Sequence, residues 1–375
     1  MQFPSPHSFV PNSDVCAHAL ADLPESGGIY ALTAGDHPPH LSYSINLKRR
    51  LTRLLVPSYN AAPKYFSKYT EKLSSISYWP VASRLESALV LYAVTSHYYP
   101  GDYLRRLRLR MPWFLSLTNA DAFPRLEVSN RLTRHGSSKF GPFPSRDLAQ
   151  QHEEQLLSLH QLRRCTETLA PDPEHPGCIY GEMNQCLRPC QCVVSAEEYA
   201  SEAARVQEFL LTSGKSALNT LVAARERAAA ELDFEQAAML HKRIEKVQAA
   251  AASRDKVIAP VDSFHGVALT KSTQADAVCL WPMLAGHWQA PVHLRVGAPQ
   301  PDAKPLDASV REALKCATES PDDSGNRLEH LAVWSRWYYS TWCDGQWFPF
   351  KTLEGLNYRR LVRAMGNLIK CGGNG

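Results

Sequence analysis

The chain has 375 residues, of which 44% are hydrophobic and 21% are charged, an ordinary composition for two to four globular domains. It contains no run of about 18 apolar residues and no N-terminal signal pattern, so we expect a cytoplasmic protein with no membrane span. The charge is uneven: residues 1–150 hold 17 Lys/Arg against 10 Asp/Glu (+7), and the rest hold 24 against 27 (−3). A basic N-terminal third suits a polyanionic partner such as DNA, although a solvated basic surface would look the same.

In chain order, residues 28–130 alternate short apolar runs with helical stretches, which predicts a compact α+β segment. Residues 84–98 carry apolar side chains at helical spacing and are followed by Pro100-Gly101, which predicts a helix that ends there. The next run, LRRLRLR, alternates Leu and Arg, which predicts a strand with its arginines on one face. The arginines that we expect to contact DNA phosphates are Arg49, Arg50, Arg106, Arg108 and Arg110.

The next segment, about 150–195, is expected to be rich in loops and holds five of the ten cysteines. Four of them follow the spacing Cys165-x12-Cys178-x7-Cys186-x3-Cys190. In a cytosolic chain such a cluster indicates metal binding rather than disulfides, and soft sulfur ligands select zinc or an iron–sulfur cluster. Paired CxxC knuckles are absent, which disfavours zinc without excluding it, and a set of reduced buried thiols is the structural alternative.

Three helices are expected after the cysteines. Ser195 and Glu198 form a capping box that predicts a helix start. Two amphipathic stretches, 216–232 and 234–250, are separated by Asp233, a good N-cap, and predict an antiparallel helical hairpin.

The C-terminal part, 256–375, is expected to be an α+β module of unknown function. Its apolar pieces GVALT, AVCLW and PVHLRV predict strands, and a helix is predicted near 327–343. An aromatic stripe on that helix is more typical of a core than of a base-stacking platform. The stripe consists of Trp334, Trp337, Tyr338 and Trp342. The whole chain is therefore assigned to the α+β class.

The cysteine segment resembles the middle of the UvrC family, the nuclease component of the UvrABC excinuclease. The resemblance rests on the run CIYGEMNQCLRPC, on RRC before it, and on FGPF at residues 140–143. It implies that Cys165, Cys178, Cys186 and Cys190 hold a [4Fe-4S] cluster. Cys192 has no counterpart in the family and could compete with Cys190.

The stretch ELDFEQAAMLHKRIEKV is similar to the UVR motif, the helical hairpin through which UvrC meets UvrB, its partner in the excinuclease. The resemblance implies that a UvrB-like excinuclease protein is a partner. The residues that match the motif are Asp233, Phe234, Glu235, Ala237 and Ala238. A plain hairpin packed on its neighbours is the alternative.

The N-terminal part resembles a GIY-YIG nuclease domain, through Gly28-Ile29-Tyr30 and the run NLKRRL at residues 46–51. Tyr30 and Arg50 match the first tyrosine and the arginine of that family. The second motif reads His40-Leu41-Ser42, and the family lysine after it is Tyr43. Leu91 stands where the metal-binding glutamate belongs, and Tyr103 stands where the family has an asparagine.

The resemblance therefore implies a nuclease fold with a vestigial site, in which Mg²⁺ has a role only if the site functions. We expect five segments: 15–110 (GIY-YIG-like), 111–155 (connecting strands with FGPF), 156–195 (cysteines), 196–255 (helices with the hairpin) and 256–375. The last is too short for the RNase H-like nuclease of UvrC. The leading hypothesis is a DNA-binding, repair-associated protein without cleavage. The alternatives are a metal-dependent endonuclease rearranged around Tyr30, His40, Arg50 and Glu86, and an iron–sulfur redox sensor.

Overall fold

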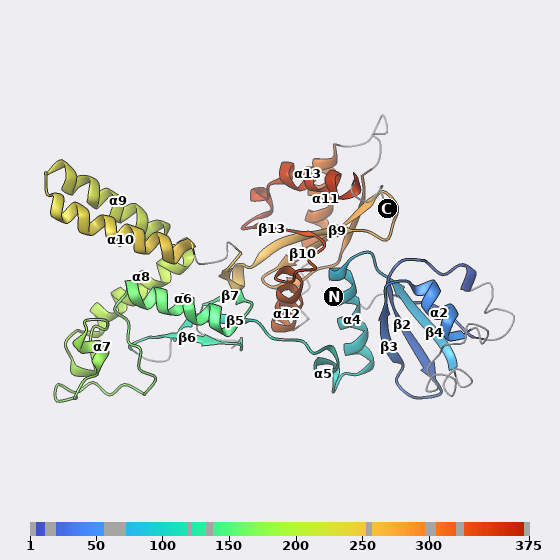
Figure 1. The fold of residues 1–375 in the computed structure, drawn as a ribbon, viewed down its shortest axis with the longest axis horizontal. Coiled ribbons are helices and arrows are strands. Elements are labelled where there is room, and N and C mark those ends of the chain that lie inside the picture. Colours follow the sequence, from blue (N-terminus) through green and yellow to red (C-terminus); the bar gives the residue numbers. More distant parts are fainter. Residues whose placement is uncertain are drawn as a thin grey trace. The chain divides into compact units, whose positions relative to one another are not determined.

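The computed structural model describes residues 5–11, 20–55, 73–118, 122–132, 138–252, 257–296, 305–319 and 326–370. The chain forms two compact units, one made of Met1–Arg110 with His265–Gly375 and the other of Met111–Phe264 (Figure 1). In sequence, the second unit is thus an insertion between the two halves of the first. Helices and antiparallel strands occur in both units, which confirms the predicted α+β class. None of the described helices is both long and apolar enough to cross a membrane.

The N-terminal half of the first unit is an antiparallel sheet with a helix packed on each face. Its strands follow the order β1-β4-β2-β3 and are β1 (His7–Phe9), β2 (Gly28–Ala34), β3 (His40–Ser44) and β4 (Leu73–Pro80). Successive residues of β2 point to opposite faces of the sheet. Tyr30 therefore packs with α2 (Leu47–Leu55), whereas Ile29 packs with α4 (Arg84–Tyr98).

Helix α4 begins and ends where the sequence predicts. Ser83 is its N-cap, and the Ser83 hydroxyl accepts the backbone N–H of Glu86 at 3.1 Å. The buried side chains Leu85, Leu89 and Val94 follow helical spacing. The apolar periodicity together with Pro100-Gly101 was sufficient to locate this helix.

The strand predicted from LRRLRLR is wrong, because residues Tyr103–Leu107 form the short helix α5. The Asp102 carboxylate pairs with Arg105 at 2.7 Å and with Arg106 at 3.1 Å, which are the i,i+3 and i,i+4 positions of a helix. Arg108 ends the helix with a left-handed backbone, φ 49°. The alternation of Leu and Arg is therefore a coincidence of composition and does not reflect a strand.

The C-terminal half of the first unit is a second antiparallel sheet, in the order β11-β10-β9-β13 with β12 also paired to β10. Its strands are β9 (His265–Lys271), β10 (Ala277–Leu284), β11 (His287–Trp288), β12 (Val292–Arg295) and β13 (Gln346–Phe350). The first, second and fourth of these confirm the three predicted strands. Helices α11 (Leu306–Glu319) and α13 (Tyr358–Lys370) share an apolar core with the sheet.

The aromatic helix of this half is α12 (Arg327–Tyr338), which ends five residues earlier than predicted. Trp334 and Trp337 are fully buried, which confirms the interpretation as core for these two residues, whereas Tyr338 is half-buried. Trp342 lies beyond the helix and is 42% exposed.

The second unit combines a sheet in the order β6-β5-β7-β8 with a group of helices. The strands are β5 (Trp113–Leu117), β6 (Leu126–Ser129), β7 (Lys139–Phe143) and β8 (Ala259–Pro260). The helices are α6 (Arg146–Leu159), α7 (Ile179–Glu182), α8 (Ala196–Thr212), α9 (Lys215–Ala230) and α10 (Phe234–Ala252). Short 3₁₀ turns occur in this unit at Pro189–Gln191 and Val261–Ser263, and in the first unit at Leu353–Gly355. The FGPF motif is strand β7, and its Gly141–Pro142 bond is cis.

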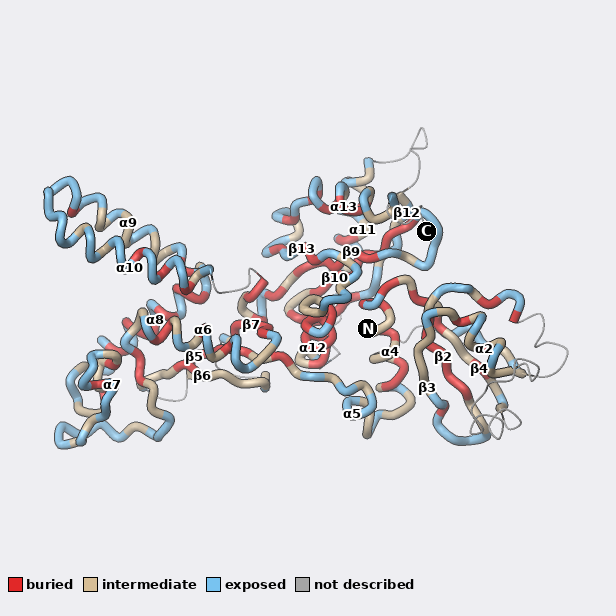
Figure 2. Tube along the Cα trace, viewed as in Figure 1, coloured by how far each residue is buried: buried red, intermediate tan, exposed pale blue. Residues whose placement is uncertain are grey.

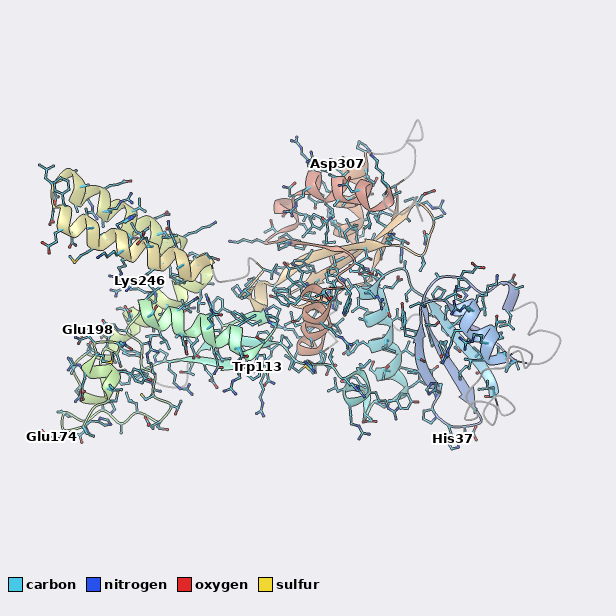
Figure 3. All side chains as sticks on the ribbon, viewed as in Figure 1. His37, Trp113, Glu174, Glu198, Lys246 and Asp307 are labelled. Carbon is cyan, nitrogen blue, oxygen red and sulfur yellow. The ribbon has the colours of Figure 1, made fainter. Side chains whose placement is uncertain are left out.

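Two details of this unit bear on the sequence predictions. The segment from 150 is helical up to Leu159, because Ser145 caps α6 and that helix buries Ala149 and Leu156 in the core. The capping box of Ser195 and Glu198 at the start of α8 is confirmed, and Figure 3 labels Glu198 at that position.

The helical hairpin is also confirmed. The Asp233 carboxylate accepts the Gln236 N–H at 2.9 Å, as an N-cap does. Helices α9 and α10 lie side by side, and most of their surface is exposed (Figure 2).

Candidate functional site

The four cysteines of interest lie in the second unit, in the long irregular segment between α6 and α8. Cys178 is the N-cap of the short helix α7, and Cys190 lies in the 3₁₀ turn Pro189–Gln191. The backbone N–H of Asp172 donates to the Cys190 carbonyl at 2.9 Å, so the loop between Cys165 and Cys178 returns to the last cysteine. Figure 3 labels Glu174 on this loop.

The four thiols lie close enough for their charges to influence one another. Burial raises the pKa of Cys186, and the neighbouring Cys165, Cys178 and Cys190 raise it further, against the lowering effect of the Arg188 N–H. The pKa of Cys190 is raised by burial and then by Cys178 and Cys165. Within the described residues, no group of three or more His, Cys, Asp or Glu side chains is placed to hold a metal ion. The four thiols thus lie in one region, but within the described residues they are not arranged as a metal-ligand set.

A buried arginine, which the sequence reasoning did not single out, holds this segment in place. Arg163 is 2% exposed. Its side chain donates to the Phe123 carbonyl at 2.8 Å, to the Glu167 carbonyl at 2.9 Å and to the Cys165 sulfur at 3.8 Å. Its backbone N–H donates to the Tyr199 hydroxyl of α8 at 2.8 Å. Arg163 therefore fixes the start of the cysteine segment against α8, and its guanidinium places a positive charge beside Cys165.

In the first unit, two of the predicted nuclease residues are in contact. The Arg50 Nε of α2 donates to the Tyr30 hydroxyl of β2 at 3.0 Å. Tyr30 is fully buried in the core between the sheet and α2. The two residues that match the GIY-YIG resemblance are thus in contact.

The residues around the expected metal position form an apolar cluster. Leu91 packs against the core between β2 and α4, together with Leu41 and Tyr43. Glu86 lies at the N-terminus of α4, where its carboxylate accepts the Ala82 N–H at 2.7 Å. His40 is the exposed first residue of β3.

Tyr103 does not face an open site. Its hydroxyl donates to the Glu329 carboxylate of α12, at 2.9 and 3.0 Å from the two oxygens. Glu329 was not predicted, because no local motif distinguishes it from other glutamates at the start of a helix.

The arginines expected to bind DNA are exposed, except for the half-buried Arg50. Arg106 pairs with Asp102 and stacks on the Tyr99 ring at 3.8 Å. Because α5 replaces the predicted strand, Arg106, Arg108 and Arg110 do not share the face of a strand. Their exposure still leaves them accessible to a polyanion.

On the hairpin, the expected partner-binding residues lie at and beyond the turn between α9 and α10. Phe234 is 70% exposed, and Leu232 before it and Met239 after it are also exposed. Asp233, Glu235 and Ala238 are exposed, and Ala237 is half-buried. The turn thus presents an apolar surface to solvent in this structure.

Comparisons with known proteins find a family match within the second unit. Residues 112–209, from β5 to the last turns of α8, match the family described as UvrC/Cho excinuclease, middle domain. That span contains β7 with the FGPF motif and all four cysteines. The N-terminal half of this chain is UvrC-like.

Individual relatives extend the similarity beyond the middle domain. UvrABC system protein C of Ruminiclostridium cellulolyticum is 28% identical over 61% of this chain and 38% of its own length. The protein of the same name from Renibacterium salmoninarum is 28% identical over 68% of this chain and 37% of its own length. The UvrC-like chain thus spans about two fifths of the length of the curated relatives it matches. No solved structure matches it.

Proposed function

We propose that this UvrC-like chain acts in nucleotide excision repair by binding DNA and a UvrB-like excinuclease partner, without nuclease activity of its own. The matched relatives carry the name UvrABC system protein C, which supports the assignment to that system. The exposed apolar turn of the hairpin supports partner binding, and the basic N-terminal segment supports DNA binding.

The observation that carries the absence of cleavage is Leu91 in its apolar cluster. GIY-YIG-type cleavage needs a carboxylate that holds a divalent ion, which stabilises the charge on the leaving oxygen. Leu91 cannot supply that ligand, and it packs among apolar side chains. Arg50 beside Tyr30 can still bind a phosphate, but removal of one member of a coupled catalytic set usually abolishes the rate.

We further propose that Cys165, Cys178, Cys186 and Cys190 hold a [4Fe-4S] cluster. The thiolate is the form that binds iron. Arg163 donates to the Cys165 sulfur at 3.8 Å, and its backbone contact with Tyr199 orders the segment. The role that we assign to the cluster is structural: it would hold the irregular segment between α6 and α8.

A cleavage assay tests the central claim. The purified chain is incubated with nicked, branched and ultraviolet-damaged duplex DNA in the presence of Mg²⁺ or Mn²⁺. We expect the DNA to be bound, with affinity that falls steeply as salt rises, and to remain intact.

The matched pair Arg50→Ala and Arg53→Ala completes this experiment. Arg53 is an exposed arginine of the same helix and is not among the arginines expected to contact DNA, so it controls for the loss of one positive charge. Cleavage by the wild-type chain that disappears in Arg50→Ala and persists in Arg53→Ala would replace our proposal with an active, rearranged nuclease.

A further inference from the structure

A buried carboxylate joins the two halves of the first unit. Glu329 of α12 is 2% exposed. It accepts hydrogen bonds from the Tyr92 hydroxyl of α4 at 2.6 Å and from the Tyr103 hydroxyl of α5 at 2.9 Å. These donors are 237 and 226 positions away in the sequence. A third donor, the Asn326 side-chain amide, lies within the C-terminal half at 2.7 Å.

The cost of burying the Glu329 carboxylate favours contact between the two halves of the first unit. A buried carboxylate is costly unless donors replace the water that it loses, and a hydrogen bond to a charged group is stronger than one between neutral groups. Burial and the nearby Glu329 raise the pKa of Tyr103 to about 12, so the hydroxyl remains a donor at physiological pH. Two of these three side-chain donors come from the N-terminal half, so Glu329 gains them only when the halves are joined.

Further contacts extend along α4 and α5. The His330 ring meets the Tyr92 ring edge to face at 5.8 Å between centroids. The Arg336 guanidinium donates to the Leu107 carbonyl at 3.2 Å. Near the start of α4, the Arg84 N–H donates to the Asp344 carboxylate at 2.5 Å. These contacts between the two halves of the first unit, here called the joint, therefore run from Arg84 to Leu107, over the length of both helices.

Helix α12 is buried between the C-terminal sheet and helix α4. Eight of its twelve residues are buried, including the polar residues Glu329, His330 and Ser335. Trp334 packs on Trp347 of β13, and the His330 carbonyl accepts from the indole of Trp288 in β11. One side of α12 thus belongs to the C-terminal sheet and another to α4. A helix buried on opposite sides is a core element.

We propose that the helices on which related nucleases carry their metal ligand and asparagine have become, in this chain, the docking surface for its own C-terminal half, with Glu329 as the anchor. Tyr103 stands at the asparagine position of the resemblance and now donates to Glu329. Tyr92 directly follows Leu91, which stands at the position of the metal ligand. The residue at the asparagine position therefore contacts the C-terminal half, the residue after the metal-ligand position does so too, and His265–Lys370 folds with the N-terminal domain as one body.

Hydrogen exchange measured on the full chain tests this joint. The variants are Tyr103→Phe, Glu329→Gln and the double substitution. The control is Tyr180→Phe, which changes a half-exposed tyrosine of the second unit. We expect each of the first two variants to speed exchange about ten-fold or more in both 84–107 and 327–338, with no change at α9. We expect the increase in exchange rate in the double variant to be well below the product of the two single increases, because both substitutions remove the same hydrogen bond.

The segments in which exchange becomes faster distinguish loss of contact between the two halves from a local effect of the substitution. Faster exchange restricted to 327–338 in Glu329→Gln, or to 103–107 in Tyr103→Phe, would overturn the proposal. Effects that multiply in the double variant would also overturn it. Should Glu329→Gln fail to fold, Tyr103→Phe alone still decides, because it removes a single hydroxyl whose loss must be felt 226 positions away in sequence. DNA binding and cleavage do not enter this measurement, so it stands apart from the proposed function.

Discussion

At the scale of single residues, Tyr30 and Arg50, which match two positions of the GIY-YIG resemblance, are in contact. Their hydrogen bond ties β2 to α2 across a buried core, so the pair contributes to the fold whether or not any chemistry occurs. Leu91 packs against the separate core on the other face of the sheet. Packing alone can therefore account for all three residues, and their identities do not require nuclease function.

Glu86 gives a test of how the joint responds to pH. Burial, helped by the negative charge of Asp344, raises the pKa of Glu86 to about 7, against the Ala82 and Ser83 N–H groups that lower it. A raised carboxyl pKa means that the fold prefers the neutral form, so stability is lost as pH rises from about 4.5 to 7. Glu86→Gln is neutral at every pH and keeps an acceptor for the Ala82 N–H. We expect it to stabilise the chain at pH 8 by up to about 3 kcal/mol and to change little at pH 4.

Hydrogen exchange in α4, recorded as the urea concentration rises, measures the change in the free energy of unfolding at the two pH values. Glu25→Gln is the control, because Glu25 is exposed and forms only a surface ion pair with Lys48 at 3.4 Å. Equal effects of Glu86→Gln at pH 4 and pH 8 would mean that Glu86 does not titrate in this range.

At the scale of elements, the segment between α6 and α8 has little regular structure to hold it. Apart from α7 and one 3₁₀ turn it is irregular, and it exposes Ile179 and Met183. Such a segment needs cross-links to keep one conformation, and a four-thiolate centre would supply them. Arg163 and Tyr199 anchor the end of the segment nearest α6.

The proposed cluster makes a compositional prediction. Protein purified without oxygen should be brown and contain about four irons per chain. Cys178→Ser should lose most of this iron, whereas Cys192→Ser should keep it, because Cys192 lies outside the four positions of the family pattern. Colourless protein with stoichiometric zinc, or equal loss in both variants, would contradict the assignment.

We predict that a UvrB-like partner binds at the turn of the hairpin. Phe234 is the single Phe, Tyr or Trp side chain of the hairpin, and it is 70% exposed. An aromatic side chain that becomes buried on binding typically dominates an interface. Phe234→Ala should weaken binding to a UvrB-like protein at least roughly 30-fold, without loss of helix. Isothermal titration calorimetry measures the affinity, and circular dichroism reports the helix content.

Leu211→Ala is the matched control for the hairpin. Leu211 is an exposed apolar residue of α8 in the same unit, and it lies outside the hairpin turn. A similar loss in Leu211→Ala, or unchanged affinity in Phe234→Ala, would remove the turn from the interface.

At the scale of the whole molecule, the chain inserts one unit into another. The unit that begins with Met1–Arg110 is completed only by His265–Gly375, after the unit with the cysteines and the hairpin. Contacts of large sequence separation, such as Glu329 with Tyr92, are typical of such an arrangement. They cannot be inferred from local patterns, because periodicity links only residues that are near one another in the chain.

The sequence by itself determined the elements with strong local signals. Helix α4, the capped helix α8, the hairpin and three C-terminal strands follow from periodicity and capping, which act over a few residues. The four cysteines and the pair of Tyr30 and Arg50 were identified from motifs; the structure brings Tyr30 and Arg50 into contact and places the cysteines near one another in one segment.

Only the tertiary structure decided the rest. The alternation in LRRLRLR favoured a strand, but Asp102 and its two ion pairs favour a helix, and short segments are the least determined by pattern. Arg163 and Glu329 look like ordinary surface residues in the sequence, since a charged side chain is usually exposed. They are buried because the fold surrounds each with donors or acceptors from distant segments.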